Sequence, residues 1–288
     1  MKTSLIMEGG AMRGMFTCGV IDVLLEHGIK FDGAAGISAG AVFGCNFKSR
    51  QIGRPVRYNM KYCRDPRYCS LRSLIRTGDL YGVDFCYREL PDELDVFDRQ
   101  AFRDNPMAFY AGATDIQRGE CVFRNCKDGS DDDMTWFRAS ASMPLVSRPV
   151  AFDGLQLLDG GITVAVPYSY MESLGYDRNV IVLTQPKGYR KRPASGLALM
   201  RLAYRRYPCL VDAMIRRHEM YNREMDEIDE REQTGVSLVI RPPEALNIGR
   251  TEKHPEELER VYRIGRAEME RRLPELKAFL DCGTKVEV

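Results

Sequence analysis

The chain of 288 residues has 44% apolar side chains, which is ample for one substantial hydrophobic core. Its 42 Lys and Arg residues nearly cancel its 41 Asp and Glu residues, so the net charge of +1 gives no global signal for nucleic acid or for an acidic partner. Nine cysteines without a Cys-x-x-Cys pair and only three histidines argue against a disulfide framework and a zinc site, and favour a reducing, cytoplasmic setting.

The first fifty residues predict two βα units. An apolar run gives a strand over 3–7, and apolar residues at helical spacing give a helix over 14–26 that Gly28 ends. A short strand over 31–35 and a helix from Ala39 form the second unit. The opening of the chain is therefore typical of a parallel α/β fold.

A segment rich in arginine and tyrosine interrupts this pattern over 51–106. We expect it to be a helical insertion or lid, with helices near 54–62 and 84–90. The sheet resumes with a strand over 108–114, and a hairpin partner is expected over 121–123.

The middle of the chain predicts a helix over 132–142, which Pro144 ends. Two short apolar runs, 149–152 and 155–158, flank the dipeptide Asp153-Gly154, which is a strong two-residue hairpin turn.

The last third predicts two more strands, 179–184 and 236–240, and two long helices, 197–231 and 255–280. We therefore expect one domain over 1–288. Its motif-bearing core covers about 3–184, and a C-terminal extension of helices and a strand covers about 185–288.

A Gly-x-Ser-x-Gly pentapeptide places Ser38 between Gly36 and Gly40 at the predicted strand-to-helix turn. Such a turn holds a serine hydroxyl exposed at the edge of a sheet, so Ser38 is the candidate nucleophile. One βα unit earlier, a glycine-rich turn follows the first strand and opens a helix. Its backbone N–H groups are placed to bind a developing oxyanion. The turn consists of Gly9, Gly10, Ala11, Met12, Arg13 and Gly14.

Asp159 is the best candidate for the base that takes the proton of Ser38. It stands at the end of an apolar strand, and Gly160 and Gly161 after it let the backbone turn sharply. A carboxylate in this role must reach the hydroxyl directly or through one water, and must stay ionised.

Four motifs in this order resemble those of the patatin-like phospholipase family: the glycine-rich turn, the Gly-x-Ser-x-Gly elbow, an Ala-Ser-x-x-x-Pro segment with Ser140 and Pro144, and the Asp-Gly-Gly loop. They span about 9–161, somewhat over half of the chain. The resemblance implies a three-layer α/β/α patatin-like fold with a mainly parallel central sheet.

The same resemblance implies a role for each matching residue. Ser38 would attack as nucleophile, and Asp159 would take its proton without help from a histidine. The amides of Gly10 and Ala11 would hold the oxyanion, while Arg13 would add positive charge or order the turn. The chain departs from the commonest triple-glycine form at Ala11, which leaves open how that amide is oriented.

Two other interpretations of these motifs remain. His218 or His254 follows Asp159 in the sequence and would complete a Ser-Asp-His triad, although Ser38 lies too early in the chain for the elbow of a standard α/β-hydrolase. The glycine-rich turn could bind a dinucleotide, but its spacing does not match the Rossmann fingerprint. His27 is expected only to complement the end of the first helix.

Local charge departs from the neutral average over 187–223, where ten Lys and Arg residues alternate with apolar ones and face only two acidic residues. The segment is either a helix packed on the core with a solvated basic face, or a surface for anionic membranes. Nucleic acid is not an expected partner, because an acidic stretch follows at once and no nucleic-acid module is visible. No apolar stretch reaches the length of a spanning helix.

We therefore expect a serine acyl hydrolase that cleaves lipid esters, of phospholipase A or lysophospholipase type, and that needs no metal or organic cofactor. A thioesterase or another carboxylesterase is the first alternative, since the dyad sets the chemistry and not the leaving group. A catalytically silent lipid-binding or regulatory protein is the second.

Overall fold

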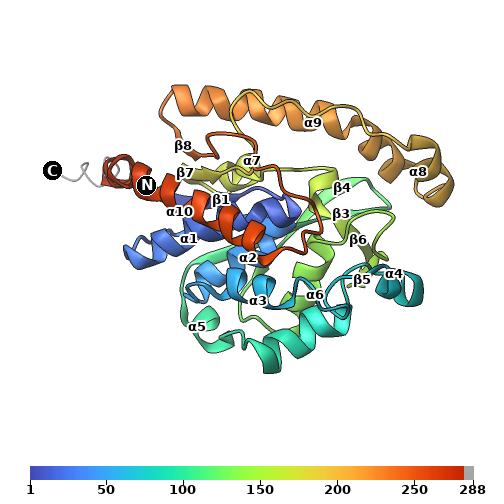
Figure 1. Ribbon diagram of the computed structural model, residues 1–288. Coiled ribbons are helices and arrows are strands. Elements are labelled where there is room, and N and C mark those ends of the chain that lie inside the picture. The colour runs from blue at the N-terminus through green and yellow to red at the C-terminus, as the bar shows by residue number, and fades with distance from the viewer. Residues whose placement is uncertain (282–288) are drawn as a thin grey trace.

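A computed structural model of the protein describes residues 1–281 (Figure 1). The predicted C-terminal extension continues to residue 288, and its last seven residues lie outside the described part. The strands are Lys2–Met7 (β1), Gly33–Ile37 (β2), Ala108–Asp115 (β3), Glu120–Cys126 (β4), Val150–Phe152 (β5), Leu155–Asp159 (β6), Tyr176–Val182 (β7) and Ser237–Ile240 (β8).

These strands form one mixed sheet in the order β5-β6-β3-β2-β1-β7-β8. β2 and β6 pair with successive parts of one edge of β3, and β4 pairs with its opposite edge. The central strands β3, β2, β1, β7 and β8 are mutually parallel, whereas β4 and β6 run antiparallel to β3 and β5 runs antiparallel to β6. The carboxyl ends of the parallel strands therefore gather at one edge of the sheet.

Alternation along the central strands explains why helices cover both faces. Leu5 and Met7 face one hydrophobic cluster, and Ile6 between them faces another. β8 follows the same rule, with Leu238 and Ile240 on the first side and Val239 on the second. Because successive strand residues point to opposite faces, a fully apolar strand requires cover on both.

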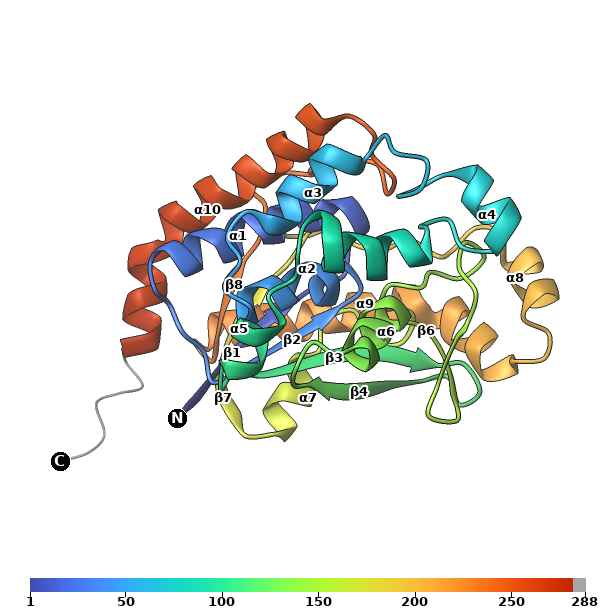
Figure 2. The same cartoon turned by 90° about the horizontal axis from the view of Figure 1, so that it is seen from below.

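Helices supply that cover and give three layers (Figures 1 and 2). α7 and α9 lie on one side of the sheet, while α1, α2, α3, α6 and α10 lie on the other. The helices are Met15–Glu26 (α1), Ala39–Lys48 (α2), Arg54–Tyr62 (α3), Leu71–Thr77 (α4), Arg99–Asp104 (α5), Asp131–Ser140 (α6), Tyr168–Ser173 (α7), Leu197–Ala203 (α8), Pro208–Gln233 (α9) and Pro255–Asp281 (α10), with 3₁₀ turns at Ala11–Gly14 (η1) and Gly160–Ile162 (η3) and a π-helical segment at Phe85–Leu94 (η2). The predicted α/β class with a mainly parallel sheet is confirmed.

Several predicted boundaries were wrong. The second strand covers 33–37 and not 31–35, and it begins where Gly33 pairs with Ser4 of β1. The long helix predicted over 197–231 is two helices, because the chain leaves helical geometry at Tyr204 and Tyr207 and starts again at Pro208. Proline suits the first position of the new helix, since its missing N–H would have no intrahelical acceptor there.

Two strands meet end to end along one edge of β3. These two strands are β2 and β6. β4 pairs with the opposite edge of β3 over Phe109–Asp115. On the edge that they share, β2 ends with Ile37 opposite Gly112, and β6, which runs the opposite way, ends with Asp159 opposite Ala113. Ser38 follows Ile37, and Asp159 is the last residue of β6. The pairing of these strands with adjacent residues of β3 therefore brings Ser38 and Asp159 together.

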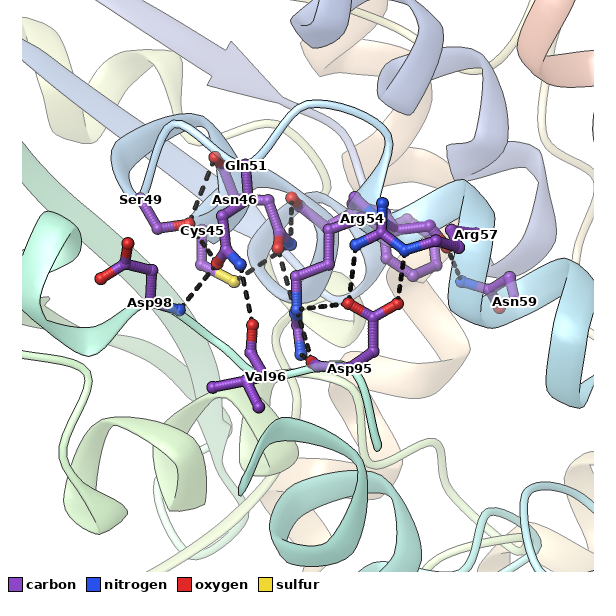
Figure 3. A network of polar contacts seen from close by, with 12 residues as sticks. Cys45, Asn46, Ser49, Gln51, Arg54, Arg57, Asn59, Asp95, Val96 and Asp98 are labelled. Atoms are coloured by element: carbon purple, nitrogen blue, oxygen red, sulfur yellow. Dashed lines mark hydrogen bonds and ion pairs between the residues drawn. The ribbon is translucent and has the colours of Figure 1, made fainter. Parts of the chain in front are cut away.

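The arginine-rich segment between α2 and β3 is helical, as predicted, and a partly buried network of polar contacts holds it in place (Figure 3). Arg54 donates to the backbone oxygen of Asp95 and to the side-chain oxygen of Asn46 on α2. Arg57 holds both carboxylate oxygens of Asp95 at 2.7 Å. Planar guanidinium groups suit such paired contacts, so the loop after η2 is held against α2 and α3.

The C-terminal elements are built into the same sheet and layers. β8 pairs in parallel with β7, and α10 packs along α1 (Figure 1). A methyl group at Gly19 would lie 2.2 Å from the backbone oxygen of Tyr262, and one at Gly265 would lie 2.0 Å from that of Phe16. Two glycines thus let the backbones of α1 and α10 approach closely.

Candidate active site

Ser38 occupies a tight turn between β2 and α2, at the carboxyl edge of the sheet. Its φ of 53° and ψ of −119° lie in a region that favours glycine, and such a conformation costs about 1–3 kcal/mol. The flanking glycines allow it: a methyl group at Gly36 would lie 2.3 Å from the backbone oxygen of Gly40, and one at Gly40 would lie 2.3 Å from that of Met7.

The Ser38 hydroxyl donates a hydrogen bond to Oδ2 of Asp159 at 2.7 Å. The other carboxylate oxygen accepts the backbone N–H of Gly161 at 2.8 Å, which fixes the orientation of the group. Both side chains are buried. Burial raises the pKa of Asp159, while the positive charge of Arg217 and the hydrogen bonds from Ser38 and Gly161 oppose this shift.

The Ala-Ser-x-x-x-Pro segment at the end of α6 positions both groups. Ser140 donates to the backbone oxygen of Gly112 at 2.6 Å, and its hydroxyl oxygen accepts the backbone N–H of Ser38 at 2.9 Å. Two residues later, the backbone oxygen of Ser142 accepts the N–H of Asp159 at 2.8 Å. The sequence singled out this segment but assigned no role to Ser140.

The glycine-rich turn lies beside Ser38. A methyl group at Gly9 would lie 3.0 Å from Cβ of Ser38, and one at Gly10 would lie 2.6 Å from the hydroxyl of Thr184. Ala11 has a φ of 49°, the left-handed conformation that a third glycine would adopt easily. Within residues 1–281, the amides of Gly10 and Ala11 donate to no protein acceptor.

Gly14 and Gly160 also lie where neighbouring atoms leave no room for a side chain. A methyl group at Gly14 would lie 2.8 Å from the Phe43 ring of α2, and one at Gly160 would lie 2.4 Å from the backbone oxygen of Gly112. Glu8, which precedes the glycine-rich turn, is buried and accepts hydrogen bonds from Thr184 and Tyr221. These contacts anchor the turn to the end of β7 and to α9.

None of the three histidines contacts Ser38 or Asp159. His218 approaches the backbone oxygen of Ile215 in its own helix, and His254 pairs with Glu252. His27 follows the last residue of α1 and is exposed. The arrangement therefore contains a Ser-Asp pair, and the alternative triad is not assembled.

A largely apolar pocket opens beside Ser38. Its wall combines residues of α2 with aromatic side chains of the helical segment between α2 and β3 and with the chain after α6. Asp79 and Arg138, which lie 3.7 Å apart, are its charged pair. The lining residues include Ser38, Ala39, Val42, Phe43, Tyr58, Tyr68, Tyr81, Val83, Tyr87, Leu90 and Met143.

The sequence profile described as patatin-like phospholipase matches residues 5–171, more than half of the chain. The chain belongs to the patatin-like phospholipase family. A domain of unknown function, DUF6363, matches residues 207–281 of this patatin-like protein. In the structure, that match covers α9, β8 and α10, which belong to the same three layers as the patatin-like region.

Curated relatives are distant. The uncharacterized protein YjjU of Escherichia coli is 25% identical over 273 residues, covering 92% of this chain and 75% of the relative. An uncharacterized NTE family protein of Mycobacterium tuberculosis is 27% identical, and the match spans 63% of this chain and 48% of that protein. Lysophospholipase nte1 of Aspergillus niger is 27% identical over 61% of this chain and only 11% of its own length.

Among solved structures, VipD from Legionella pneumophila aligns with 95% of this chain and 67% of its own, at a TM-score of 0.43 and 12% identity.

None of the helices within residues 1–281 combines the length and the apolar character that a membrane span requires. The same residues hold no group of three or more His, Cys, Asp or Glu side chains arranged around a metal ion.

Two cations near the pair were not assigned to the site from the sequence. Arg217 on α9 donates from Nε to the backbone oxygen of Gly161 at 2.5 Å. The charge of Lys191, in the chain between β7 and α8, also acts on the carboxylate of Asp159. In the sequence both belonged to the basic segment 187–223, and nothing in that pattern distinguishes them from its exposed arginines.

The basic segment itself divides in two. α9 packs Leu210, Met214 and Tyr221 into the hydrophobic core, which is the role expected of a core-packed helix with a solvated basic face. α8 has no buried residue, and Leu199 and Leu202 are 57% and 68% exposed. Within the basic segment 187–223, the large exposed apolar side chains therefore lie on α8 and in the chain before it.

Proposed function

We propose that this patatin-like protein is a serine acyl hydrolase that cleaves lipid esters through the pair Ser38 and Asp159. The observation that carries the proposal is the 2.7 Å hydrogen bond from the Ser38 hydroxyl to a buried carboxylate, made at a strained turn beside an apolar pocket. A serine and a base within hydrogen-bond reach are the minimum that nucleophilic catalysis requires.

Each step follows from this geometry. As Ser38 Oγ attacks the ester carbonyl, its proton passes to Asp159 Oδ2. The oxyanion that forms meets the unpartnered amides of Gly10 and Ala11. Protonated Asp159 then gives the proton to the departing alcohol, which leaves an acyl-enzyme. A water molecule, deprotonated by the same carboxylate, attacks the acyl group, and collapse of the second tetrahedral intermediate returns the proton to Ser38 and releases the fatty acid.

The environment of Ser38 supports this assignment. Ser38 precedes α2, so the positive end of the helix dipole lies beside the developing negative charge. The aromatic and aliphatic pocket wall suits an acyl chain more than a polar leaving group. The Aspergillus niger relative is named a lysophospholipase, which agrees with this substrate class.

Labelling with a fluorophosphonate probe tests the proposal. We expect the wild-type protein to be labelled at Ser38 and the Ser38→Ala variant to remain unlabelled. Ser142→Ala is the matched control, because Ser142 lines the same pocket and its hydroxyl donates to the backbone oxygen of Arg138, away from Ser38 and Asp159. Absence of labelling in the wild type would contradict the proposal and favour a silent lipid-binding protein.

Esters and thioesters of the same acyl chain separate the enzyme classes. We expect faster turnover of lysophospholipids and other lipid esters than of the matched acyl thioester. A preference for the thioester would identify a thioesterase instead, with the same nucleophile.

We further infer that α4 and α8 dock the enzyme on an anionic phospholipid bilayer. Both helices lie at the same end of the molecule (Figures 1 and 2), and neither has a buried residue. Both helices carry exposed apolar side chains: on α4, Leu71 is 71% exposed and Ile75 is 84% exposed, and on α8, Leu199 and Leu202 are 57% and 68% exposed. We call these four residues the apolar tips.

The apolar tips flank the segment that borders the pocket. Leu145 donates its N–H to the Tyr204 hydroxyl after α8, at 2.8 Å. Leu80, just after α4, donates its N–H to the backbone oxygen of Val146 at 2.8 Å. A bilayer that receives the apolar tips would therefore lie next to the pocket opening.

The charge of this surface supports an anionic bilayer as the partner. Five exposed arginines stand among or beside the apolar tips, and none has a carboxylate within 4 Å in the part of the chain that the structure describes. Basic and apolar side chains together suit the interface of an anionic bilayer. The five are Arg72, Arg76, Arg201, Arg205 and Arg206.

Co-sedimentation with vesicles tests this surface. We expect binding to vesicles that contain phosphatidylglycerol and weak binding to pure phosphatidylcholine, with the Leu199→Glu/Leu202→Glu variant losing the former. Val236→Glu is the control, because Val236 is 42% exposed at the opposite edge of the sheet, next to the start of β8. Equal sedimentation of both variants, or a lack of binding by the wild type, would exclude the surface.

A further inference from the structure

Three cations lie around the Ser38–Asp159 pair without a carboxylate partner. Arg13 comes from the glycine-rich turn, Lys191 from the chain between β7 and α8, and Arg217 from α9. We call these three residues the basic cluster. All three are partly buried, and none has an ion-pair partner within 4 Å among residues 1–281.

Specific contacts place each cation. Arg217 is oriented by its 2.5 Å hydrogen bond to the backbone oxygen of Gly161, directly after the Asp-Gly dipeptide. The Lys191 ammonium lies 3.9 Å from the ring centroid of Tyr221, and the Tyr221 hydroxyl bonds to Glu8. The Nε atom of Arg13 is buried and has no protein acceptor in the described chain. The charges of Arg13 and Arg217 both act on Lys191.

The nearby carboxyl groups are engaged elsewhere. Asp159 accepts from Ser38 and Gly161, and Glu8 accepts from Tyr221 and the end of β7. Glu224 accepts the backbone N–H groups of two consecutive residues, and burial raises its pKa to about 8, so it is mostly neutral at pH 7. None of these carboxyl groups therefore lies within 4 Å of a cluster cation as an ion pair, although the charges of Asp159 and Glu8 act on the cluster from farther away.

Gathering unpaired cations in a partly buried site is unfavourable, because each loses hydration and repels the others. The pKa of Lys191 is lowered to about 7, first by burial and next by the charge of Arg217. Burial also lowers the pKa of Arg217. The charges of Asp159 and Glu8 oppose the lowering at Arg217, and a further bound anion would favour the charged forms of both cations.

We propose that the basic cluster binds the phosphate monoester of an acyl glycerol 3-phosphate substrate whose ester carbonyl lies at Ser38. This inference rests on the proposed acyl hydrolase function and names its substrate class. A phosphate monoester carries nearly two negative charges and three acceptor oxygens at neutral pH, which match two guanidinium groups and one ammonium. A carboxylate has fewer charges and fewer acceptor sites.

The proposal also gives a role to the C-terminal region. Arg217 lies in the segment 207–281 that matches a domain of unknown function, and Lys191 lies outside the matched patatin-like residues. Two of the three members of the basic cluster therefore come from beyond the part of the chain that carries the Ser38 and Asp159 motifs. This C-terminal region would select the head group while the patatin-like region performs the acyl transfer.

Calorimetric titration of the Ser38→Ala variant tests binding without turnover. With glycerol 3-phosphate as the probe at pH 7, we expect saturable binding that Lys191→Met weakens about tenfold or more. Arg192→Met is the matched control, since it removes one positive charge from the exposed neighbour. Glycerol should not bind. Inorganic phosphate that binds as tightly as glycerol 3-phosphate would point to free phosphate as the ligand and overturn the substrate assignment.

Proton uptake supplies a readout that a structural role of Lys191 would not change. A phosphate beside Lys191 favours its charged form and so raises its pKa from about 7. Near pH 8 the binding enthalpy should therefore depend on the ionisation enthalpy of the buffer, and Lys191→Met should remove that dependence. Binding without proton uptake in the otherwise unmodified Ser38→Ala variant would contradict the placement of phosphate at Lys191.

Kinetics separates this proposal from the function on which it rests. We expect Lys191→Met to lower the kcat/KM ratio of an acyl glycerol 3-phosphate over the matching monoacylglycerol about tenfold, and Arg192→Met to leave the ratio unchanged. An equal fall for both substrates would overturn the head-group role. If no ester is hydrolysed by the wild type, the acyl hydrolase proposal fails, while the calorimetric result still decides whether the basic cluster binds phosphate.

Discussion

Ser38 and Asp159 are 121 positions apart in the chain and 2.7 Å apart in space, because the strands that lead to them end head to head along one edge of β3. β2 arrives in parallel and stops opposite Gly112, and β6 arrives antiparallel and stops opposite Ala113. Ser140 then fastens the junction by bonding to Gly112 and to the amide of Ser38. The separation of the two groups is thus set by backbone register and not by long, flexible side chains.

Asp159→Asn should remove turnover and leave the fold intact. The amide keeps the shape of the carboxylate but cannot accept the Ser38 proton, so we expect kcat/KM to fall by about 10²- to 10⁴-fold. Thermal unfolding should show an equal or higher midpoint, because a buried charge is removed. Asp153→Asn is the control: it makes the same change at an exposed hairpin turn, where φ is 46° and asparagine is tolerated. Retained activity in Asp159→Asn would mean that another group is the base.

The pH dependence of activity should depend on Arg217. Because burial raises the pKa of Asp159 above 3.8, activity should begin to fall at a higher pH than for an exposed aspartate as the solution is acidified. The positive charge of Arg217 opposes that shift, so Arg217→Gln should raise the pKa further and move the acid limb of kcat/KM upward by about one unit. Arg216→Gln changes an exposed neighbour that pairs with Asp212, and its profile should match the wild type. An unmoved limb in Arg217→Gln would show that its charge does not act on the base.

Local signals were sufficient for the elements that carry the site. Apolar runs and flanking glycines predicted β1, β2, β6 and the helix after Ser38, and the motif order predicted which two residues would be paired. The short helices α4, α5 and α7 were missed, since each has only six or seven residues and too few apolar positions to show a helical period. Their placement depends on tertiary contacts that no local window contains.

The basic cluster shows a second kind of limit. Arg217 and Arg216 are neighbours with the same side chain, yet one bonds to the Asp-Gly-Gly loop and the other lies at the surface. The difference has two causes. The helical period indicates which face of α9 packs on the sheet, but it does not indicate which loop lies beneath that face. A residue's role in a site depends on the second fact.

Strain at Ser38 should be measurable by comparing two inactive variants. Ser38→Ala and Ser38→Gly both lose the hydrogen bond to Asp159, but only glycine adopts a φ of 53° and ψ of −119° without strain. We expect the free energy of unfolding in urea to be about 1 kcal/mol or more higher for Ser38→Gly. At Ser142, which does not have a positive φ, the same pair of substitutions should show the usual disadvantage of glycine. If Ser38→Gly is the less stable variant, the turn holds no strain.

The pocket wall should set which acyl chains are accepted. Val42 lies on α2, one turn after Ser38, and lines the pocket. A phenylalanine there would fill part of the space beside the nucleophile, so Val42→Phe should lower kcat/KM for a hexadecanoyl ester about tenfold relative to a butanoyl ester. Val96→Phe makes the same substitution at a side chain that is 57% exposed and absent from the pocket wall, and its selectivity should equal that of the wild type. A parallel fall for both esters in Val42→Phe, at an unchanged melting temperature, would show that the acyl chain lies elsewhere.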